Sequence, residues 1–375
     1  MDWSALRTEL PVTERWAYFD HAAVAPITLR AAKAMREWTE DLVANGLLNE
    51  RRWLERIEAV RSMAARLIGA EPLDLAFIKN TSEGVGIVAE GFPWRAGDNV
   101  VIAQEEYPAN QYPWMNLRER GVEVRAVASR PDGRLWIDDI VAAMDSQTRV
   151  LSLSWVEFAS GFRNDLDVLG EICRQRNIAF FVDAIQGLGV FPLDVQKTPV
   201  DFLAADGHKW LLGPEGAGVL WIRREWIERL RPIDIGWNSV IGSRDFGTID
   251  FRLKPHAGRY ESGTLNVAGI TALGGSLELL LEIGIDAMNK RVLELTDYLC
   301  QRVDEKKSPT VYSSRQPGDK SAIVSLAYAD PNKTTAKMRL CRSNGLIVNK
   351  RAGRLRVSPH CYNSFEEIDR LLRYL

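Results

Sequence analysis

The sequence predicts an α/β protein in which helices flank a mostly parallel sheet of about seven strands, followed by a smaller C-terminal α+β domain. Two observations predict this fold class. Segments of helical period alternate with short apolar or β-branched runs through the first two-thirds of the chain, which is typical of helices packed on a parallel sheet. The 375 residues, 46% hydrophobic and 26% charged, have the length and composition of a globular protein with a large core.

The elements of the large sheet are predicted in order along the chain. Helices are expected at residues 29–43, 50–68, 82–91, 110–120 and 166–176. Strands are expected at residues 75–79, 99–103, 122–128, 149–155, 178–183, 202–205 and 217–222. A sheet of this size can hold a ligand at the edge where its parallel strands end.

The last third of the chain has a different pattern. Residues 231–259 contain Gly, Pro, Asp and Ser without a clear period, which indicates a linker or an active-site loop. Two long amphipathic stretches follow at 268–283 and 285–303, and strands and helices then alternate over 322–326, 334–342, 346–349, 355–358 and 365–374. We therefore expect a large domain at 26–262 and a small one at 263–375, with residues 1–25 packing on the small domain.

Composition excludes several classes of function. The formal net charge of −2 gives no basic surplus for nucleic acid, so a small molecule is the expected partner. The first residues lack the features of a signal peptide and no apolar run is long enough to span a bilayer, so we expect a cytoplasmic protein without a membrane partner. The four cysteines and four histidines are too scattered for a disulfide framework or a metal site: Cys173, Cys300, Cys341, Cys361, His21, His208, His256 and His360.

Asp183 and Lys209 are the most informative pair in the sequence. Asp183 ends an apolar strand, so its carboxylate needs a partner such as a protonated ring nitrogen; capping of a following helix is the alternative. Lys209 follows the next strand in a glycine-rich loop, and the apolar residues after it argue against an ordinary solvated lysine. An aspartate and a lysine at one sheet edge can hold the two ends of pyridoxal 5'-phosphate (PLP), the ring nitrogen and the aldehyde.

Other residues supply the remaining parts of such a site. Thr81 and Ser82 open a helix directly after a strand, where hydroxyl and amide groups can bind a phosphate, although this pattern also marks ordinary helix capping. His208 and Asp206 are further candidates for the phosphate cradle, although an aspartate there would need another partner. Gln186, three residues after the aspartate, is a candidate ligand of the ring hydroxyl.

Two candidates remain for the ring face and the substrate. Tyr107 lies just past a strand and can stack on the ring, unless it is a core or surface tyrosine. Arg356 shares a strand face with Arg354 and can clamp a substrate carboxylate through two parallel hydrogen bonds, unless that face is solvated. Further candidates for lining the pocket are Trp114, Trp155, Arg163, Trp237 and residues 234–250.

With these residues in place, the chain resembles the class V aminotransferase family of fold-type I PLP enzymes, which includes cysteine desulfurases, cystine lyases, kynureninase and isopenicillin N epimerase. The resemblance runs almost end to end. Its motifs are Tyr18-Phe19-Asp20-His21-Ala22-Ala23, Asn80-Thr81-Ser82-Glu83-Gly84, Glu106-Tyr107-Pro108-Ala109-Asn110, Val182-Asp183-Ala184-Ile185-Gln186, Gly207-His208-Lys209, Arg259-Tyr260-Glu261-Ser262-Gly263-Thr264-Leu265-Asn266 and Arg356-Val357-Ser358.

The resemblance implies the PLP-transferase fold of type I and a role for each matching residue. Lys209 corresponds to the lysine that forms a Schiff base with the cofactor, Asp183 to the partner of the pyridinium and Gln186 to the ligand of the ring hydroxyl. Thr81, Ser82 and His208 correspond to phosphate-binding residues, and Arg356 to the arginine that binds the substrate carboxylate. Thr264 matches a threonine donated to the phosphate of the neighbouring subunit, which implies a homodimer.

Departures from the family pattern bear on the reaction. Cysteine desulfurases carry a nucleophilic cysteine on a loop shortly before the substrate arginine, whereas residues 348–356 here contain none. Tyr107 replaces a stacking histidine, Phe158 stands where an asparagine is common, and Asp206 replaces a phosphate-binding serine. The sequence therefore indicates a PLP-dependent enzyme acting on an amino acid, of the aminotransferase, epimerase or C–S lyase type.

Two other interpretations remain from the sequence. The chain can be a cysteine desulfurase despite the missing cysteine loop, or a non-catalytic relative that binds PLP. A nicotinamide-dependent enzyme is disfavoured because no Gly-x-Gly-x-x-Gly follows the first strand.

Overall fold

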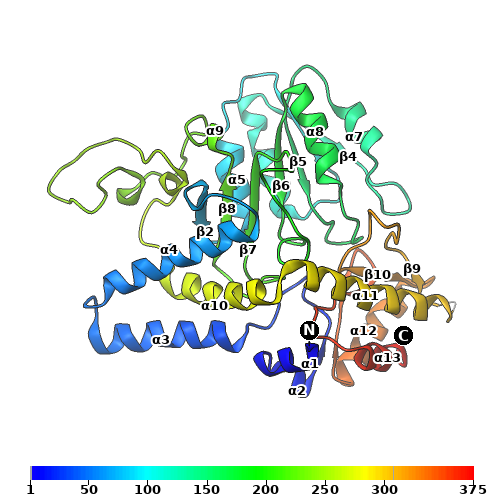
Figure 1. Ribbon diagram of the computed structural model, residues 1–375. Helices are drawn as coiled ribbons and strands as arrows, with labels where there is room; N and C mark the ends of the chain where they lie inside the picture. Colours follow the sequence, from blue (N-terminus) through cyan, green and yellow to red (C-terminus); the bar gives the residue numbers. More distant parts are fainter. Residues whose placement is uncertain (1, 307) are drawn as a thin grey trace.

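A seven-stranded sheet forms the centre of the computed structural model, which describes residues 2–306 and 308–375 (Figure 1). Its strand order is β2-β8-β7-β6-β5-β3-β4. The strands are β2 (Leu75–Ile78), β3 (Asn99–Ala103), β4 (Glu123–Val127), β5 (Thr148–Ser154), β6 (Ala179–Asp183), β7 (Phe202–Asp206) and β8 (Gly218–Ile222). Only β8 runs against its neighbours, being antiparallel to both β7 and β2. The predicted mostly parallel sheet is confirmed.

The central strands are apolar because both faces of the sheet are covered. All residues of β6, β7 and β8 are buried. Alternate residues of a strand enter different hydrophobic clusters: Phe180 and Val182 pack in one, and Ala179 and Phe181 in the other. Two covered faces therefore explain near-continuous apolar runs where an exposed sheet would alternate apolar and polar residues.

Helices occur at the predicted ranges 29–43, 50–68, 82–91 and 166–176, the predicted range 110–120 differs, and two short helices at 137–143 and 224–227 were not predicted. They are α3 (Leu29–Asn45), α4 (Glu50–Leu67), α5 (Thr81–Gly91), α6 (Tyr112–Asn116), α7 (Ile137–Ala143), α8 (Leu166–Arg176) and α9 (Arg224–Ile227). The prediction of one helix over 110–120 was wrong, because α6 is a short helix between two 3₁₀ turns. Pro113 lacks an amide hydrogen and is tolerated only in the first turn, so no continuous helix can run from 110 through it.

A second, smaller set of elements follows in the chain. The helices α10 (Val267–Ile283) and α11 (Ile285–Asp304) lead to an antiparallel sheet with the order β12-β13-β10-β9. Its strands are β9 (Thr310–Val311), β10 (Val324–Ala327), β12 (Asn349–Arg351) and β13 (Arg354–Val357), and the helices α12 (Pro331–Ser343) and α13 (Phe365–Leu372) pack with it. The single strand predicted at 346–349 is divided between β11 (Leu346–Ile347) and β12, which pair with different partners.

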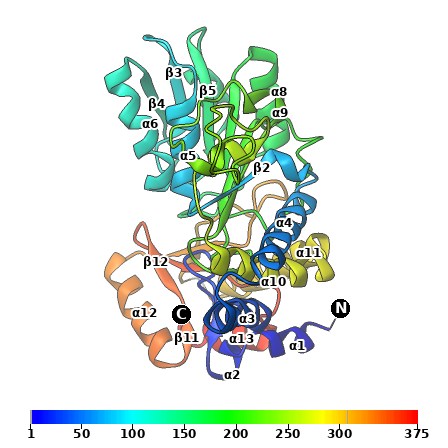
Figure 2. The same cartoon turned by 90° about the vertical axis from the view of Figure 1, so that its left-hand side faces the viewer.

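The N-terminal segment contacts this C-terminal set. After the short helices α1 (Trp3–Leu6) and α2 (Val12–Arg15), β1 (Ala17–Tyr18) pairs in parallel with β11, and Phe19 enters the same hydrophobic cluster as α11 and α13. The helix α10 packs against α3 and α4 below the large sheet (Figure 2). The domain boundary at 262/263 stays a prediction.

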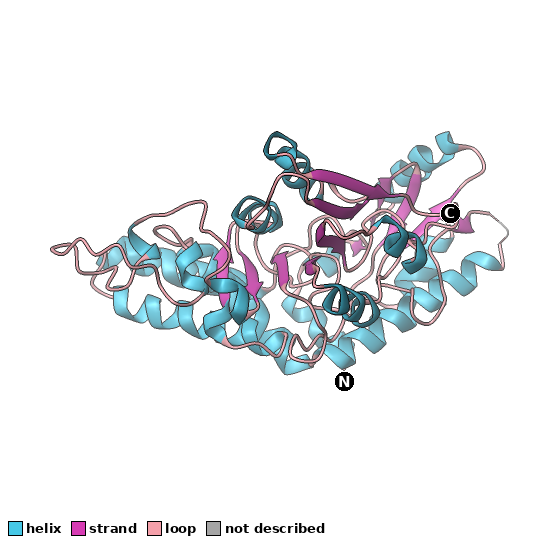
Figure 3. Cartoon of the chain, turned by 90° about the horizontal axis from the view of Figure 1, so that it is seen from above, coloured by secondary structure: helices cyan, strands magenta, loops and turns pink. Residues whose placement is uncertain are grey.

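The irregular segment 231–259 extends away from the body of the protein (Figures 1 and 3). It contains one 3₁₀ turn, Trp237–Ser239, and ends at another, Ala257–Tyr260. Several of its large apolar side chains are exposed, including Phe246, Ile249 and Phe251. No single helix in the described part of the chain is long and apolar enough to cross a membrane; the pair α10 and α11 has the length and composition together but is bent by 82°.

Candidate cofactor and substrate site

The carboxyl ends of neighbouring parallel strands bring the predicted site residues to one edge of the sheet. Asp183 ends β6, and β7 beside it ends at Asp206. Lys209 follows in the turn after β7, and Tyr107 lies in the loop after β3. This is the edge at which open α/β sheets bind their ligands.

Asp183 is a buried carboxyl with few internal partners. It is 2% exposed, and its Oδ1 accepts a hydrogen bond from the Ile185 N–H at 3.0 Å. Burial raises its pKa to about 6, against a smaller lowering by this hydrogen bond and by the charge of Lys209. Residues 184–201 form turns and irregular structure, so the alternative of an aspartate capping the next helix is excluded. A cationic N–H partner would compensate the buried charge.

Lys209 is buried rather than solvated. It is 8% exposed, and Trp210, Leu211 and Leu212 after it are also buried. Burial lowers its pKa to about 8, while Asp183 acts in the opposite direction. A lysine with a lowered pKa has a larger fraction of free amine near neutral pH, and the free amine is the nucleophile that attacks an aldehyde. The chemistry of this side chain fits a covalent bond to PLP.

The candidate phosphate residues gather at the first turn of α5. Thr81 begins this helix, and its Oγ1 accepts a hydrogen bond from the Asp206 N–H at 3.1 Å. Asp206 Oδ2 lies 2.8 Å from Nδ1 of His208, and Asp206 Oδ1 accepts from the Gly207 N–H at 2.7 Å. Asp206 is therefore engaged by the Gly207 amide and lies next to the His208 imidazole, although their contact does not have hydrogen-bond geometry. Ser82 is exposed at the same helix end, where amide groups and the helix dipole favour an anion.

Gln186 connects three segments of the chain. Its Nε2 donates to the Ala22 carbonyl at 3.0 Å, and its Oε1 accepts from the Trp210 indole N–H at 2.9 Å. These bonds leave one amide hydrogen of Gln186 for a ring hydroxyl. Thr264 is exposed in the loop before α10, and its contact with a neighbouring subunit stays a prediction.

Arg356 is buried and partly engaged. It is 1% exposed; Nη2 donates to Asp20 Oδ1 at 3.3 Å and Nη1 to the Phe158 carbonyl at 3.0 Å. This excludes the solvated strand face considered for it. Among the described residues its buried Nε has no hydrogen-bond partner. An unsatisfied buried donor on a cation is costly, so the group is suited to receive an anion. Arg354 on the same strand lies over the Tyr312 ring instead, 3.8 Å from its centre.

Sequence reasoning missed two buried glutamates behind the site. Glu106 accepts hydrogen bonds from the Ser154 N–H and Oγ, both at 2.5 Å, and Glu157 accepts from Asn164 Nδ2 at 3.0 Å. Burial raises the pKa of Glu106 well above its ordinary value and that of Glu157 to about 8, and the charge of Asp183 acts in the same direction on both. A glutamate three residues after the buried strand β3 was the available signal for Glu106. Burial therefore favours the protonated form of both groups.

The other pocket candidates are structural or lie elsewhere. Trp114 and Trp155 belong to the hydrophobic clusters of the two sheet faces. Arg163 lies over the Phe191 ring at 4.6 Å from its centre, and Trp237 contacts Phe246 in the extended loop. No group of three or more metal-binding side chains occurs within residues 2–306 and 308–375.

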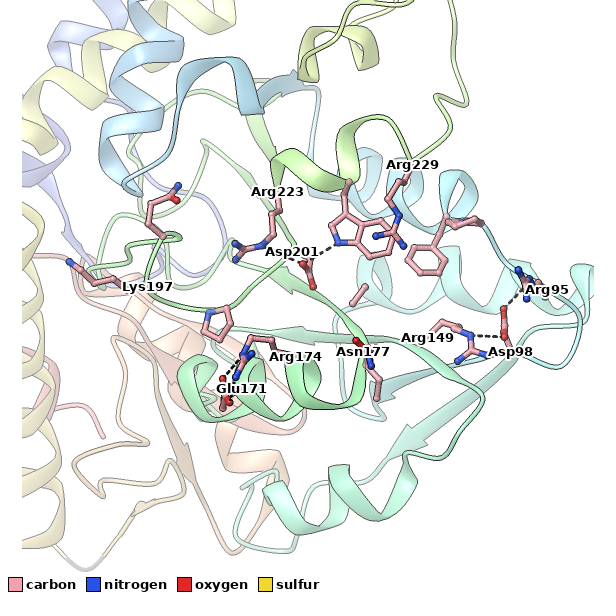
Figure 4. Close-up of a pocket in the computed structure, with 17 residues that line it drawn as sticks. Arg95, Asp98, Arg149, Glu171, Arg174, Asn177, Lys197, Asp201, Arg223 and Arg229 are labelled. Carbon is pink, nitrogen blue, oxygen red and sulfur yellow. Dashed lines mark hydrogen bonds and ion pairs between the residues drawn. The ribbon is translucent and has the colours of Figure 1, made fainter.

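A cavity of about 850 Å³ lies at the opposite edge of the sheet (Figure 4). Ala179, the first residue of β6, and Asp201, just before β7, line it. Several of its cations have acidic partners: Arg149 with Asp98, Arg174 with Glu171, Lys197 with Asp194 and Arg223 with Asp201. It contains none of the predicted site residues, and its size alone does not make it the active site.

Comparisons with known proteins identify the family of this chain. The sequence profile of the family described as "Aminotransferase class-V" matches residues 17–371. A protein of Methanothermobacter thermautotrophicus named "Probable cysteine desulfurase" is 30% identical over 384 residues, covering 98% of this chain and 95% of that protein. A relative from Pyrococcus abyssi with the same name is 29% identical and covers 99% of this chain and 96% of its own length.

Solved structures agree with the fold. The apo structure of a cysteine desulfurase from Thermococcus onnurineus superposes with a TM-score of 0.89 at 25% identity, covering 98% of this chain and 96% of the other. A lysine-to-alanine mutant of C-DES, solved with glycine covalently linked to its PLP cofactor, gives a TM-score of 0.92 at 20% identity and 98% coverage of both chains, and this likeness concerns the fold. With the family profile spanning nearly the whole sequence, the chain belongs to the class V aminotransferase family of PLP-dependent enzymes, and its fold is the fold-type I architecture predicted from the sequence.

Proposed function

We propose that this enzyme acts on an amino acid at its α-carbon, with Lys209 as the residue that holds the cofactor and moves the substrate proton. The observation that carries the proposal is the burial of Lys209 at the sheet edge where Asp183 ends β6; burial lowers the lysine pKa to about 8, against the opposite effect of the Asp183 charge. When bound, PLP supplies an electron sink for the pair released when a bond to the α-carbon breaks.

The chain's own residues have separate tasks in this proposal. With PLP bound, Asp183 would accept a hydrogen bond from the protonated ring nitrogen, Gln186 would donate to the ring hydroxyl, and Tyr107 would cover a ring face. Thr81, Ser82 and His208 bind the phosphate. As a free amine beside the α-carbon of a bound substrate, Lys209 would take the α-proton and could return it. Arg356 binds the substrate carboxylate through the donors that Asp20 and Phe158 leave free.

Reactions that begin with loss of the α-proton are the ones this residue set supports. Transamination, epimerisation and β-elimination share that step and differ in their products. A desulfurase reaction needs a thiol nucleophile as well. The four cysteines are buried, and burial raises their pKa values, to about 11 for Cys341 and about 12 for Cys361, so neither is a reactive thiolate. The names of the relatives nevertheless make cysteine desulfurase the second candidate.

The proposal includes a homodimer in the cytoplasm. Exposed apolar side chains occur on the loop after α9, among them Ile249, and between α3 and α4, among them Leu48, and Arg244 of the loop pairs with Glu50 of α4 at 3.1 Å. Apolar surface of this kind is typical of an interface, and the exposed Thr264 could then reach a partner's phosphate. Four free cysteines are typical of proteins from a reducing compartment.

The enzyme loaded with PLP provides the test. Reduction with borohydride followed by peptide mapping should find the cofactor on Lys209, and L-amino acids should change the visible absorption of the unreduced enzyme. Products identified as keto acid, D-isomer, or pyruvate with sulfide and ammonia then distinguish the three reactions. A label on another lysine, or no spectral change with any amino acid, would overturn the proposal. A protein-bound persulfide formed from cysteine would favour the second candidate.

A further inference from the structure

A short hairpin of β12 and β13 presents three arginines and an asparagine on one face, and one of the three, Arg354, lies over the Tyr312 ring outside the hydrogen-bonded chain described next. Asn349 lies opposite Arg356 in the antiparallel register, and Arg351 lies opposite Arg354. Residues directly opposite each other, and residues two apart on a strand, share a face of the sheet. Arg351 and Arg356 therefore project from the same side of the hairpin, while Lys350 projects from the other and donates to Thr335 Oγ1 at 2.9 Å.

Asp20 joins the two arginines through a chain of hydrogen bonds. Asp20 Oδ1 accepts from Arg356 Nη2 at 3.3 Å, and Oδ2 accepts from Asn349 Nδ2 at 2.7 Å. Asn349 Oδ1 in turn accepts from Arg351 Nη1 at 3.0 Å. Both oxygens of Asp20 accept hydrogen bonds, and these bonds and the charge of Arg356 favour the carboxylate, against burial, which raises the pKa of Asp20. We call Asp20, Asn349, Arg351 and Arg356 the charge cluster.

The charge cluster lies beside the reactive lysine. Arg356 donates to the carbonyl of Phe158, the Phe158 ring meets the Tyr107 ring at 5.3 Å between centres, and the Tyr107 ring centre is 5.6 Å from Lys209 Nζ. The charges of Arg356 and Arg351 both contribute to lowering the pKa of Lys209, after the larger effect of burial. Both guanidinium groups are therefore within electrostatic range of the position where a substrate reacts.

We infer that the charge cluster restricts the enzyme to amino acids with a single carboxylate and excludes acidic side chains, with Asp20 setting the limit. This inference rests on the proposed function. Two guanidinium groups and one carboxylate leave one net positive charge, which the α-carboxylate of such a substrate neutralises. An acidic side chain would add an unmatched negative charge next to Asp20 in a buried setting, where unpaired charge is expensive. The aromatic rings of Tyr107 and Phe158 beside the cluster suit an uncharged side chain.

L-Asparagine and L-aspartate are the probes, because they have nearly the same size and differ in side-chain charge. The measurement is the concentration dependence of the visible spectral change, or kcat/KM if product forms, with the PLP-loaded enzyme. We expect the wild type to favour asparagine. Asp20→Asn keeps an oxygen acceptor for Arg356 and removes the negative charge. The apparent affinity (or kcat/KM) for aspartate relative to that for asparagine should therefore rise about tenfold or more, because a hydrogen bond to a charged group contributes about this much.

Arg351→Gln tests the same cluster from the opposite direction. Removing one positive charge should lower the ratio of aspartate to asparagine and weaken the binding of both. Lys350→Gln is the matched control, because it removes the same charge from the adjacent residue on the other face, and its ratio should equal that of the wild type. Cofactor content and circular dichroism of each variant show whether it is folded and loaded.

The two proposals fail in different ways. If no amino acid changes the spectrum of the loaded wild-type enzyme, the proposed function is wrong. If amino acids bind but the wild type takes aspartate as readily as asparagine, the charge selection is wrong. The same conclusion follows if the ratio in loaded Asp20→Asn and Arg351→Gln stays at the wild-type value. Should Asp20→Asn not fold, the shift in Arg351→Gln decides.

Discussion

The amine nitrogen of Lys209 lies 5.6 Å from the centre of the Tyr107 ring. Tyr107 comes from the loop after β3 and Lys209 from the turn after β7, so the contact depends on the parallel strands between them. Phe158 meets the edge of the tyrosine ring at 79° and fixes its orientation. A ring held at this distance from the lysine can lie over a planar cofactor attached to it.

Tyr107→Ala should weaken cofactor binding, and Tyr107→Phe should leave it nearly unchanged. An aromatic pair contributes about 1 kcal/mol beyond the area it buries, so the alanine variant should lose roughly fivefold or more in PLP affinity. Titration of the apo-protein with PLP, followed by absorbance, measures this. If the phenylalanine variant lost as much as the alanine variant, the hydroxyl and not the ring face would be the contact.

Lys209→Ala should abolish turnover and the borohydride-stable link to PLP, while the protein still folds. Removing a buried amine leaves no charge behind, and burial already disfavours that charge. Mass spectrometry of the reduced protein and a thermal melt check both points. Lys197→Ala, which removes an exposed lysine, is the control and should keep both the link and the activity.

Because of Asp183, the free energy of unfolding of the apo-protein should fall as the pH rises from about 4 to about 6. Its folded pKa, about 6, lies above the ordinary 3.8, so the folded state binds more protons than the unfolded state in this window and loses stability as they leave. The shift of about two pKa units corresponds to roughly 3 kcal/mol at most. Asp183→Asn should remove this pH dependence and stabilise the apo-protein at pH 7, while lowering activity. Urea unfolding of the wild type and of Asp183→Asn at pH 4.5 and pH 7 tests this. An equal change in the free energy of unfolding between the two pH values in both proteins would contradict it.

Glu261→Ala should lower the free energy of unfolding by several kcal/mol. Glu261 Oε1 accepts from Arg61 Nη1 at 2.7 Å and from the Phe77 N–H at 2.8 Å, and both charged groups are buried. Without Glu261, the buried Arg61 keeps only the more exposed Glu58 as an acidic partner and the Phe77 N–H loses its acceptor; breaking a buried ion pair costs about 3–5 kcal/mol. Glu55→Ala breaks the exposed pair with Arg51 and should change the free energy of unfolding by less than about 1 kcal/mol. Chemical denaturation of the two variants makes the comparison.

Replacing Cys341 and Cys361 with alanine should preserve activity with amino acids. Both thiols are buried, with pKa values raised to about 11 and about 12, so neither supplies a thiolate near neutral pH. Turnover of each variant, normalised to its PLP content, is the measurement. A variant that keeps its cofactor but loses turnover would restore the thiol-dependent route.

The sequence by itself determined the sheet and placed Asp183 and Lys209 at the edge where its parallel strands end. Apolar runs of five residues between amphipathic helices require a doubly covered sheet, and the rule that parallel strands end at one edge placed the residues following β6 and β7 together. The break in the predicted helix 110–120 was also readable in the sequence, because Pro113 lacks an amide hydrogen and is not tolerated inside a helix.

Only the tertiary structure decided how these groups are paired. Arg356 and Asp20 are 336 positions apart in the chain, so no local pattern could show that the arginine is already held by a carboxylate. The buried state of Glu106 and Glu157, and the shared face of Arg351 and Arg356, follow from strand pairing and from the exclusion of water. Burial sets the free-energy cost of an unpaired charge. Because burial exists only in the folded chain, the charge balance of the site is decided by the tertiary structure.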